Sequence, residues 1–129
     1  MKKEFIIILG LCFLLISCGT SFQPNNKKNL TEYYFKKPNL KNVSYEGGDG
    51  SSFEKAVIIK NAKNTRNGIA SEYSYLEKEY GKRGTGWIFI SQSLERKNEN
   101  IYDVLRIQNN ADNEILIIHF EISDFYGKL

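Results

Sequence analysis

The chain has 129 residues, of which 41% are hydrophobic, 26% are charged and 13% are aromatic. This balance is typical of a globular protein and excludes a disordered or collagen-like chain. Two prolines exclude a proline-rich stalk, and a net charge of +3 is too small to indicate nucleic-acid binding. One histidine and two cysteines leave few ligands for a transition-metal site. We therefore expect one ordinary domain without a metal, a cofactor or a nucleic-acid partner.

The N-terminus has the pattern of a secretory signal, in which Lys2 and Lys3 precede an uncharged apolar run from Phe5 to Ile16. The run is shorter than the about 20 residues that a membrane-spanning helix needs. An uncleaved membrane anchor is the alternative. We interpret residues 1–17 as a signal peptide.

The apolar run ends in Leu15-Ile16-Ser17-Cys18. This segment resembles the lipobox of bacterial lipoproteins, where a bulky aliphatic residue stands three positions before a cysteine and a small residue stands directly before it. The resemblance implies cleavage after Ser17 and a lipid anchor on Cys18, which is stable when two or more acyl chains are attached. Within that family, Gly19 in place of an aspartate implies the outer membrane, with the domain facing the periplasm. The alternative is an ordinary buried or disulfide-bonded Cys18, but Cys12 leaves with the signal and no second thiol remains.

Residues 18–47 are predicted to be the lipidated cysteine and a basic tether. The residues after the cysteine contain both prolines and five lysines against two glutamates. The lysines either attract anionic headgroups or keep a linker solvated. The turn-rich Gly47-Gly48-Asp49-Gly50 marks the start of the domain. Residues 48–129 are predicted to be a single small α+β domain.

The domain contains one helical pattern. Ile69, Tyr73, Leu76 and Tyr80 fall on one stripe of a helix that Asn67 would cap and Gly81 would end. The acidic residues beside this stripe, Glu72 among them, are expected to face solvent.

Four segments have strand patterns, which gives the order β-α-β-β-β. The last of them is apolar on both faces, so we expect it to be central or covered on both sides. Polar connections predict hairpins between the last three, and the architecture is one helix packed on a mainly antiparallel sheet. The segments are Glu54–Lys60, Trp87 to Leu94, Ile101 to Ile107 and Ile115 to Ile122.

Catalytic hypotheses depend on few residues. His119 alternates with Ile115 and Ile117, and a Ser-His-Asp site would combine it with Asp103 or Asp124 and one serine. No nucleophile-elbow motif positions such a serine, and a lone histidine among isoleucines is more often a hydrogen-bonded sheet residue. The serines considered are Ser91, Ser93 and Ser123.

Paired carboxylates are the other route to a hydrolase that acts on an envelope substrate such as a cell-wall glycan. The pairs considered are Glu72 with Glu79 on the helix and Glu114 with Glu121 on the last strand. The spacing selects neither pair.

Tyrosines offer a binding surface because the ring is apolar and its tip is polar. Tyr75 lies off the helix stripe and Tyr102 lies opposite the more apolar face of its strand. If both are exposed, they form part of a protein or glycan contact; otherwise they complete a small core.

A second resemblance covers about residues 48–128. Gly48-Asp49-Gly50-Ser51-Ser52-Phe53-Glu54, Tyr102-Asp103-Val104-Leu105 and the ending Ser123-Asp124-Phe125-Tyr126-Gly127 are similar to a recurring pattern in small bacterial envelope proteins of uncharacterised function. The resemblance implies a domain family and supplies no activity. It indicates that Asp49, Ser51, Ser52, Asp103 and Asp124 should be tested.

The leading hypothesis is a lipid-anchored envelope protein whose domain binds a protein or glycan partner, as an inhibitor, immunity factor or accessory protein. The alternatives are a small hydrolase that uses His119 or a carboxylate pair, and a purely structural spacer.

Overall fold

A computed structural model describes residues 37–129. The interpretation of residues 1–17 as a signal peptide, the lipidation of Cys18 and most of the predicted tether lie outside the described residues. A compact unit begins at Lys37, so the domain boundary predicted at Gly48 lies inside it. No helix within residues 37–129 combines the length and the apolarity needed to cross a membrane.

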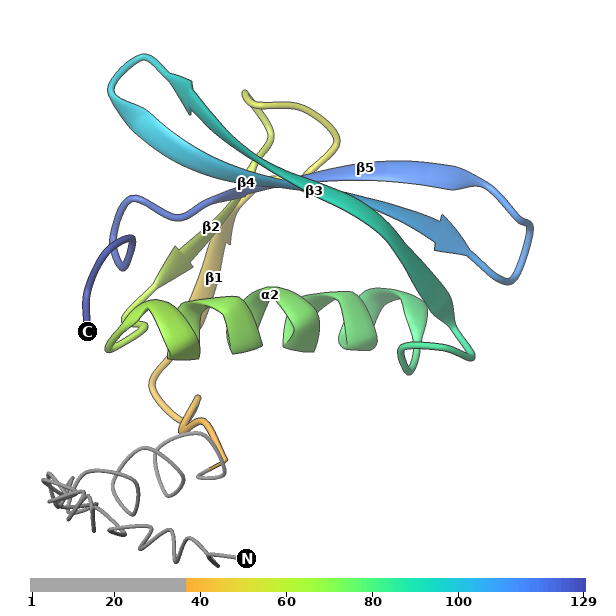
Figure 1. Cartoon of the computed structure of the whole chain (residues 1–129), viewed down its shortest axis with the longest axis horizontal. Helices are drawn as coiled ribbons and strands as arrows, with labels where there is room; N and C mark the ends of the chain where they lie inside the picture. The colour runs from red at the N-terminus through yellow and green to blue at the C-terminus, as the bar shows by residue number, and fades with distance from the viewer. Residues whose placement is uncertain (1–36) are drawn as a thin grey trace, which may run out of the picture. The chain divides into compact units, whose positions relative to one another are not determined.

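The described residues form a five-stranded sheet with one helix against it (Figure 1). The strand order in the sheet is β1-β2-β5-β4-β3. Neighbouring strands are antiparallel except β2 and β5, which are parallel. The predicted α+β architecture is confirmed. The elements are β1 (Ser44–Gly47), β2 (Val57–Lys60), α2 (Thr65–Tyr80), β3 (Trp87–Lys97), β4 (Asn100–Asn109) and β5 (Ile115–Glu121).

Strand β1 is the element that the sequence patterns did not predict, since residues 44–47 were assigned to the tether. It pairs antiparallel with β2, from Ser44 opposite Lys60 to Gly47 opposite Val57. The hydroxyl of Tyr45 donates to the backbone carbonyl of Ser71 on α2 at 2.8 Å. This edge of the sheet is therefore joined to the helix.

Helix α2 begins one turn earlier than predicted. Asn64 is the N-cap, and its side-chain oxygen accepts the backbone N–H of Asn67 at 2.9 Å, so the prediction that Asn67 caps the helix is wrong. Gly81 ends the helix with φ 87°, as predicted, and its N–H donates to the carbonyl of Glu77.

The buried face of the helix matches the predicted stripe only in part: Leu76 is buried, and Tyr73 and Tyr80 pack partly buried against the core. Ile69, at the start of the predicted stripe, is 41% exposed. The buried residues are Asn67, Gly68, Ser71, Glu72 and Leu76. The expectation that Glu72 faces solvent is therefore wrong.

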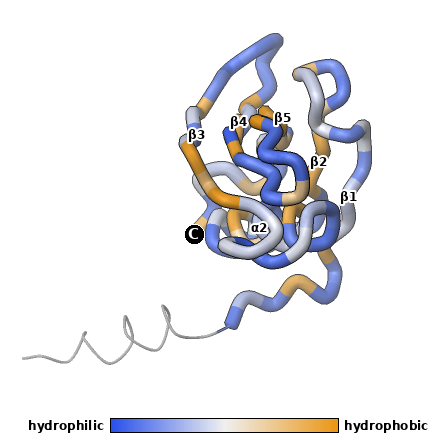
Figure 2. Tube along the Cα trace, turned by 90° about the vertical axis from the view of Figure 1, so that its right-hand side faces the viewer, coloured by the Kyte–Doolittle hydropathy of each residue, from blue (hydrophilic) through white to orange (hydrophobic). Residues whose placement is uncertain are grey.

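The core lies between α2 and one face of the sheet. Leu105 opposite Ile118 and Ile107 opposite Leu116 supply its centre from β4 and β5. Strand β5 is central, as predicted, but its other face is covered only in part, because Ile115 and Ile117 are exposed. In Figure 2 the hydrophobic beginning of β3 is the orange stretch at the left-hand edge of the described residues.

Candidate functional sites

Two carboxyl groups meet in the core between the helix and the sheet. Glu72 on α2 is fully buried and Asp103 on β4 is nearly so. The side-chain amide of Gln92, on β3, donates to Oδ2 of Asp103. The other three carboxyl oxygens, Glu72 Oε1, Glu72 Oε2 and Asp103 Oδ1, are buried and accept no hydrogen bond from a donor in residues 37–129.

Two ionised carboxylates side by side repel each other, which favours the protonated form of one of them. Burial, with the charge of Asp103 and a hydrogen bond to it, raises the pKa of Glu72 to about 9. Burial also raises the pKa of Asp103, although hydrogen bonds from Gln92 and Glu72 lower it in part. Near neutral pH Glu72 therefore keeps its proton.

A cavity of about 200 Å³ adjoins this pair. It lies below the usual range of about 300–1,000 Å³ for ligand pockets, so it suits only a small molecule. Most of its walls are apolar. It is lined by Thr65, Ile69, Glu72, Gln92, Leu94, Asp103, Ile122, Phe125 and Tyr126.

The carboxylate pairs weighed from the sequence do not form. Glu79 is exposed, two helical turns beyond the buried Glu72. Glu114 precedes β5 while Glu121 ends it, so the two lie at opposite ends of an extended strand. The signal that could have placed Glu72 in the core is its position between Gly68 and Leu76, four residues from each.

His119 holds a loop and forms no Ser-His-Asp site. Its Nδ1 lies 2.9 Å from the carbonyl oxygen of Gly50, which also accepts the backbone N–H of His119 at 2.8 Å. The ring packs against Phe53 with centroids 4.5 Å apart. Asp103 stands opposite Phe120 in the register, so its side chain lies on the other face of the sheet from His119.

Three further members of the proposed catalytic set also have structural contacts, and the fourth, Ser91, is exposed on β3. Asp124 accepts the backbone N–H of Asn61 at 3.1 Å. The hydroxyl of Ser93 donates to Glu95, and the hydroxyl of Ser123 accepts the backbone N–H of Ile101.

The loop between β1 and β2 is closed by its own side chains. Asp49 accepts both the backbone N–H and the hydroxyl of Ser51, at 3.0 and 2.6 Å, and these hydrogen bonds lower the pKa of Asp49. The hydroxyl of Ser52 accepts the backbone N–H of Lys55. Asp49, Ser51 and Ser52 therefore shape this loop.

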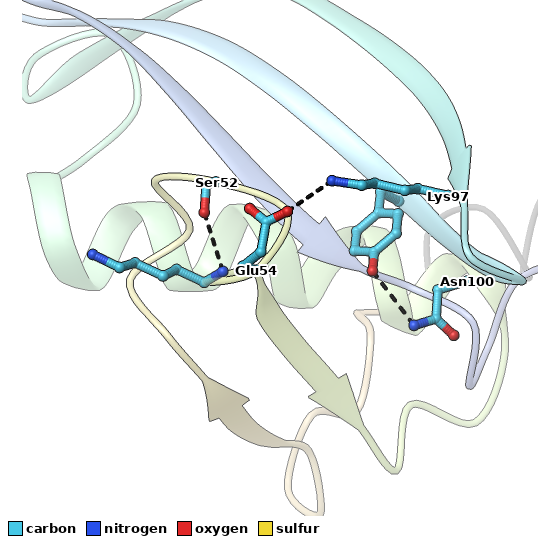
Figure 3. A network of polar contacts seen from close by, with 6 residues as sticks. Ser52, Glu54, Lys97 and Asn100 are labelled. Atoms are coloured by element: carbon cyan, nitrogen blue, oxygen red, sulfur yellow. Dashed lines mark hydrogen bonds and ion pairs between the residues drawn. The ribbon is translucent and has the colours of Figure 1, made fainter.

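The same loop is fastened to the far end of the β3–β4 hairpin (Figure 3). Lys97 Nζ lies 2.7 Å from Glu54 Oε1 and 4.7 Å from the ring centroid of Phe53. The amide of Asn100 donates to the hydroxyl of Tyr102 at 3.4 Å. The contacts of Lys97 and the His119 bonds hold the loop over the outer face of the sheet.

The two tyrosines do not form an exposed aromatic surface. Tyr102 is only 7% exposed, and its ring meets Phe53 edge-on at 5.0 Å. Tyr75 is half-buried, with centroid distances of 5.4 Å to Tyr45 and 5.6 Å to Phe120. Both complete the packing, so the hypothesis of a joint aromatic contact is wrong.

Exposed aliphatic side chains gather instead on the sheet face that points away from α2. Ile88, Ile115 and Ile117 are 46%, 42% and 50% exposed. Gln108 lies between Ile88 and Ile115 in the register, and Arg106 lies beside Ile117. We call these five residues the outer-sheet patch. The sequence pattern missed it because a strand that is apolar on both faces is usually covered on both.

Residues 37–129 bring together no group of three or more His, Cys, Asp or Glu side chains suited to a metal ion. No family model, curated protein or solved structure matches the chain.

Proposed function

We propose that this protein is anchored in the bacterial envelope by a lipid on Cys18, at the outer membrane with its domain facing the periplasm. In this proposal the domain binds a protein partner through the outer-sheet patch, as an inhibitor, immunity factor or assembly accessory protein does. The observation that carries the proposed binding is the exposure of Ile88 on β3 and of Ile115 and Ile117 on β5, on the same sheet face and either side of β4.

Contiguous exposed apolar surface is characteristic of interaction sites. Complete burial of an isoleucine side chain is worth about 1.5–3 kcal/mol, so three half-exposed isoleucines offer a partner substantial hydrophobic energy. Arg106 is exposed among them, and its guanidinium can pair with a carboxylate or with backbone carbonyls. Arginine is enriched in protein–protein interfaces and among the residues that contribute most to their binding energy.

The chemistry of the patch favours a protein partner over a glycan. Tyr75 and Tyr102, the aromatic side chains considered for a glycan contact, are packed into the fold. The patch itself is aliphatic with two polar side chains, and a partner with an apolar surface and an acidic or carbonyl group complements it.

The alternative of a glycan hydrolase has less support. His119 is held to Gly50 by its side chain. Glu72 and Asp103 are buried and close enough to influence each other's pKa, whereas glycosidase carboxyls stand about 5–9.5 Å apart to accommodate a sugar and a nucleophile or water. An identified activity that is lost in His119→Ala would restore this alternative.

The proposal is tested by affinity capture of the full-length chain from solubilised envelopes, followed by mass spectrometry. Leu129 is fully exposed, so a C-terminal tag leaves the fold undisturbed. Ile117→Lys places a charge in the patch, and Glu77→Lys makes a matched exposed change on α2. We expect one protein to be captured by the wild type and by Glu77→Lys, and at least tenfold less of it by Ile117→Lys.

Equal capture by Ile117→Lys would show that the partner binds elsewhere. Capture of no specific protein by the wild type would contradict the proposed binding and favour the structural spacer.

A further inference from the structure

The buried carboxyl pair is not needed for binding at the outer-sheet patch. Glu72 and Asp103 lie between α2 and the sheet, whereas the patch lies on the sheet face that points away from α2. From the cavity beside this pair, we propose a second site: it binds a small organic cation, a primary ammonium with a short apolar body, against Glu72 and Asp103.

The charge of the pair supports this assignment. When Asp103 is ionised and Glu72 keeps its proton, the pair carries one negative charge. The side chains that influence their pKa values are each other and Gln92, and no cation is among them in the described part of the chain. A buried charge without a countercharge costs several kcal/mol. A bound ammonium would supply the countercharge.

The hydrogen-bonding capacity points to the same head group. Glu72 Oε1, Glu72 Oε2 and Asp103 Oδ1 are buried and accept no hydrogen bond from the described residues. The proton that Glu72 keeps occupies one of its two oxygens. An ammonium offers three further N–H donors to the oxygens that remain.

The rest of the cavity suits a short aliphatic or aromatic body. Ile69, Leu94 and Tyr126 line it and are exposed, so the cavity opens to solvent between α2, β3 and the C-terminal segment. Phe125 and Ile122 form its buried walls. At the rim, the guanidinium of Arg96 lies over the ring of Tyr126 with the charge 5.6 Å from the centroid, so this cation contacts the phenol rather than the carboxyl pair.

The test is isothermal titration of the full-length protein in detergent at pH 7 and constant ionic strength. The probe is n-butylammonium chloride, and 1-butanol is the neutral probe of similar size. We expect the wild type to bind n-butylammonium at least tenfold more tightly than 1-butanol. Asp103→Asn removes the net charge and should lower the affinity for n-butylammonium at least tenfold.

Glu72→Gln is the second variant, since it keeps the shape of the side chain while an amide N–H₂ replaces one acceptor oxygen. It should also weaken n-butylammonium binding, whereas Glu79→Gln, an exposed acid on the same helix, should bind like the wild type. The proposal is overturned if the wild type does not bind n-butylammonium, if 1-butanol binds equally well, or if the Asp103 and Glu72 variants bind like the wild type.

Discussion

Glu72 has the most unusual environment of any single side chain in the described fold. A carboxyl group normally faces water, yet this one is fully buried beside a second carboxyl. It is tolerated because it keeps its proton, and a neutral acid costs far less to bury than a carboxylate. The same proton makes the stability of the domain depend on pH.

We predict that the free energy of unfolding falls as the pH rises from about 4.5 to about 9, the ordinary pKa of Glu72 and its pKa in the fold. In this range the unfolded chain has released the proton and the folded chain retains it, so each pH unit costs about 1.4 kcal/mol for one proton. Glu72→Gln removes this dependence and should be several kcal/mol more stable than the wild type at pH 8, with little difference near pH 4.

Urea unfolding at pH 5, 7 and 8 measures this effect. Glu79→Gln, at an exposed position, should follow the wild type. Parallel pH profiles of the wild type and Glu72→Gln would contradict the buried, protonated state of Glu72.

Gly68 shows a second constraint at the scale of one residue. The ring of Phe125 packs directly against this glycine, so that a Cβ would overlap three atoms of the ring. Gly68→Ala should destabilise the domain by about 1–3 kcal/mol through overpacking, although alanine is the better helix former by about 1 kcal/mol.

Chemical denaturation of Gly68→Ala beside Glu77→Ala, an exposed substitution on the same helix, checks this prediction. A Gly68→Ala protein as stable as the wild type would mean that Phe125 does not pack on this face of α2.

At the scale of elements, His119 on β5 is one of the residues that hold the loop between β1 and β2. The carbonyl of Gly50 accepts both the backbone N–H and the Nδ1 proton of His119, and Phe53 packs on the ring. His119→Ala should leave the sheet intact but release the loop. We expect faster amide hydrogen exchange in residues 48–54, with a loss of about 1–2 kcal/mol of stability.

Ser93→Ala, on the same sheet face, is the control, since its hydroxyl contacts only Glu95. Unchanged exchange in residues 48–54 of His119→Ala would show that other contacts hold the loop.

The elements with strong periodicity could be predicted from the sequence. Helix α2 and strands β3 to β5 follow their hydrophobic patterns, and Gly81 ends the helix as expected. The four-residue β1 could not be predicted because it forms only through pairing with β2. Two asparagines three residues apart, Asn64 and Asn67, are equally good caps by residue type, so the sequence alone does not decide between them.

The buried face of α2 was predicted only in part, for a similar reason. Periodicity counts large apolar residues, and the face that packs against the sheet contains Gly68, Ser71 and Glu72.

The candidate site was predicted only in part. Asp103 was indicated by a resemblance, while Glu72 was paired with the wrong acid, because a contact between a helix and a strand 31 positions away has no local signal.

At the scale of the whole molecule, the proposed protein combines a lipid anchor with a folded binding domain. The anchor is a prediction from Leu15-Ile16-Ser17-Cys18, which lies outside the described residues. Cys18→Ser should abolish metabolic labelling with a fatty acid and leave an uncleaved precursor, because the thiol is the acceptor of the diacylglyceryl group. Labelling that persists in Cys18→Ser would contradict the lipoprotein assignment without affecting the binding proposal.

The central claim is that the outer-sheet patch contacts a protein in the envelope, and site-specific photo-crosslinking in living cells tests it most directly. A photoreactive phenylalanine replaces Ile117 in the patch, or Glu79 on the opposite side of the domain, in the full-length chain. We predict one discrete crosslinked protein from position 117 and none from position 79. Crosslinks from position 79 alone, or from neither position, would contradict the claim.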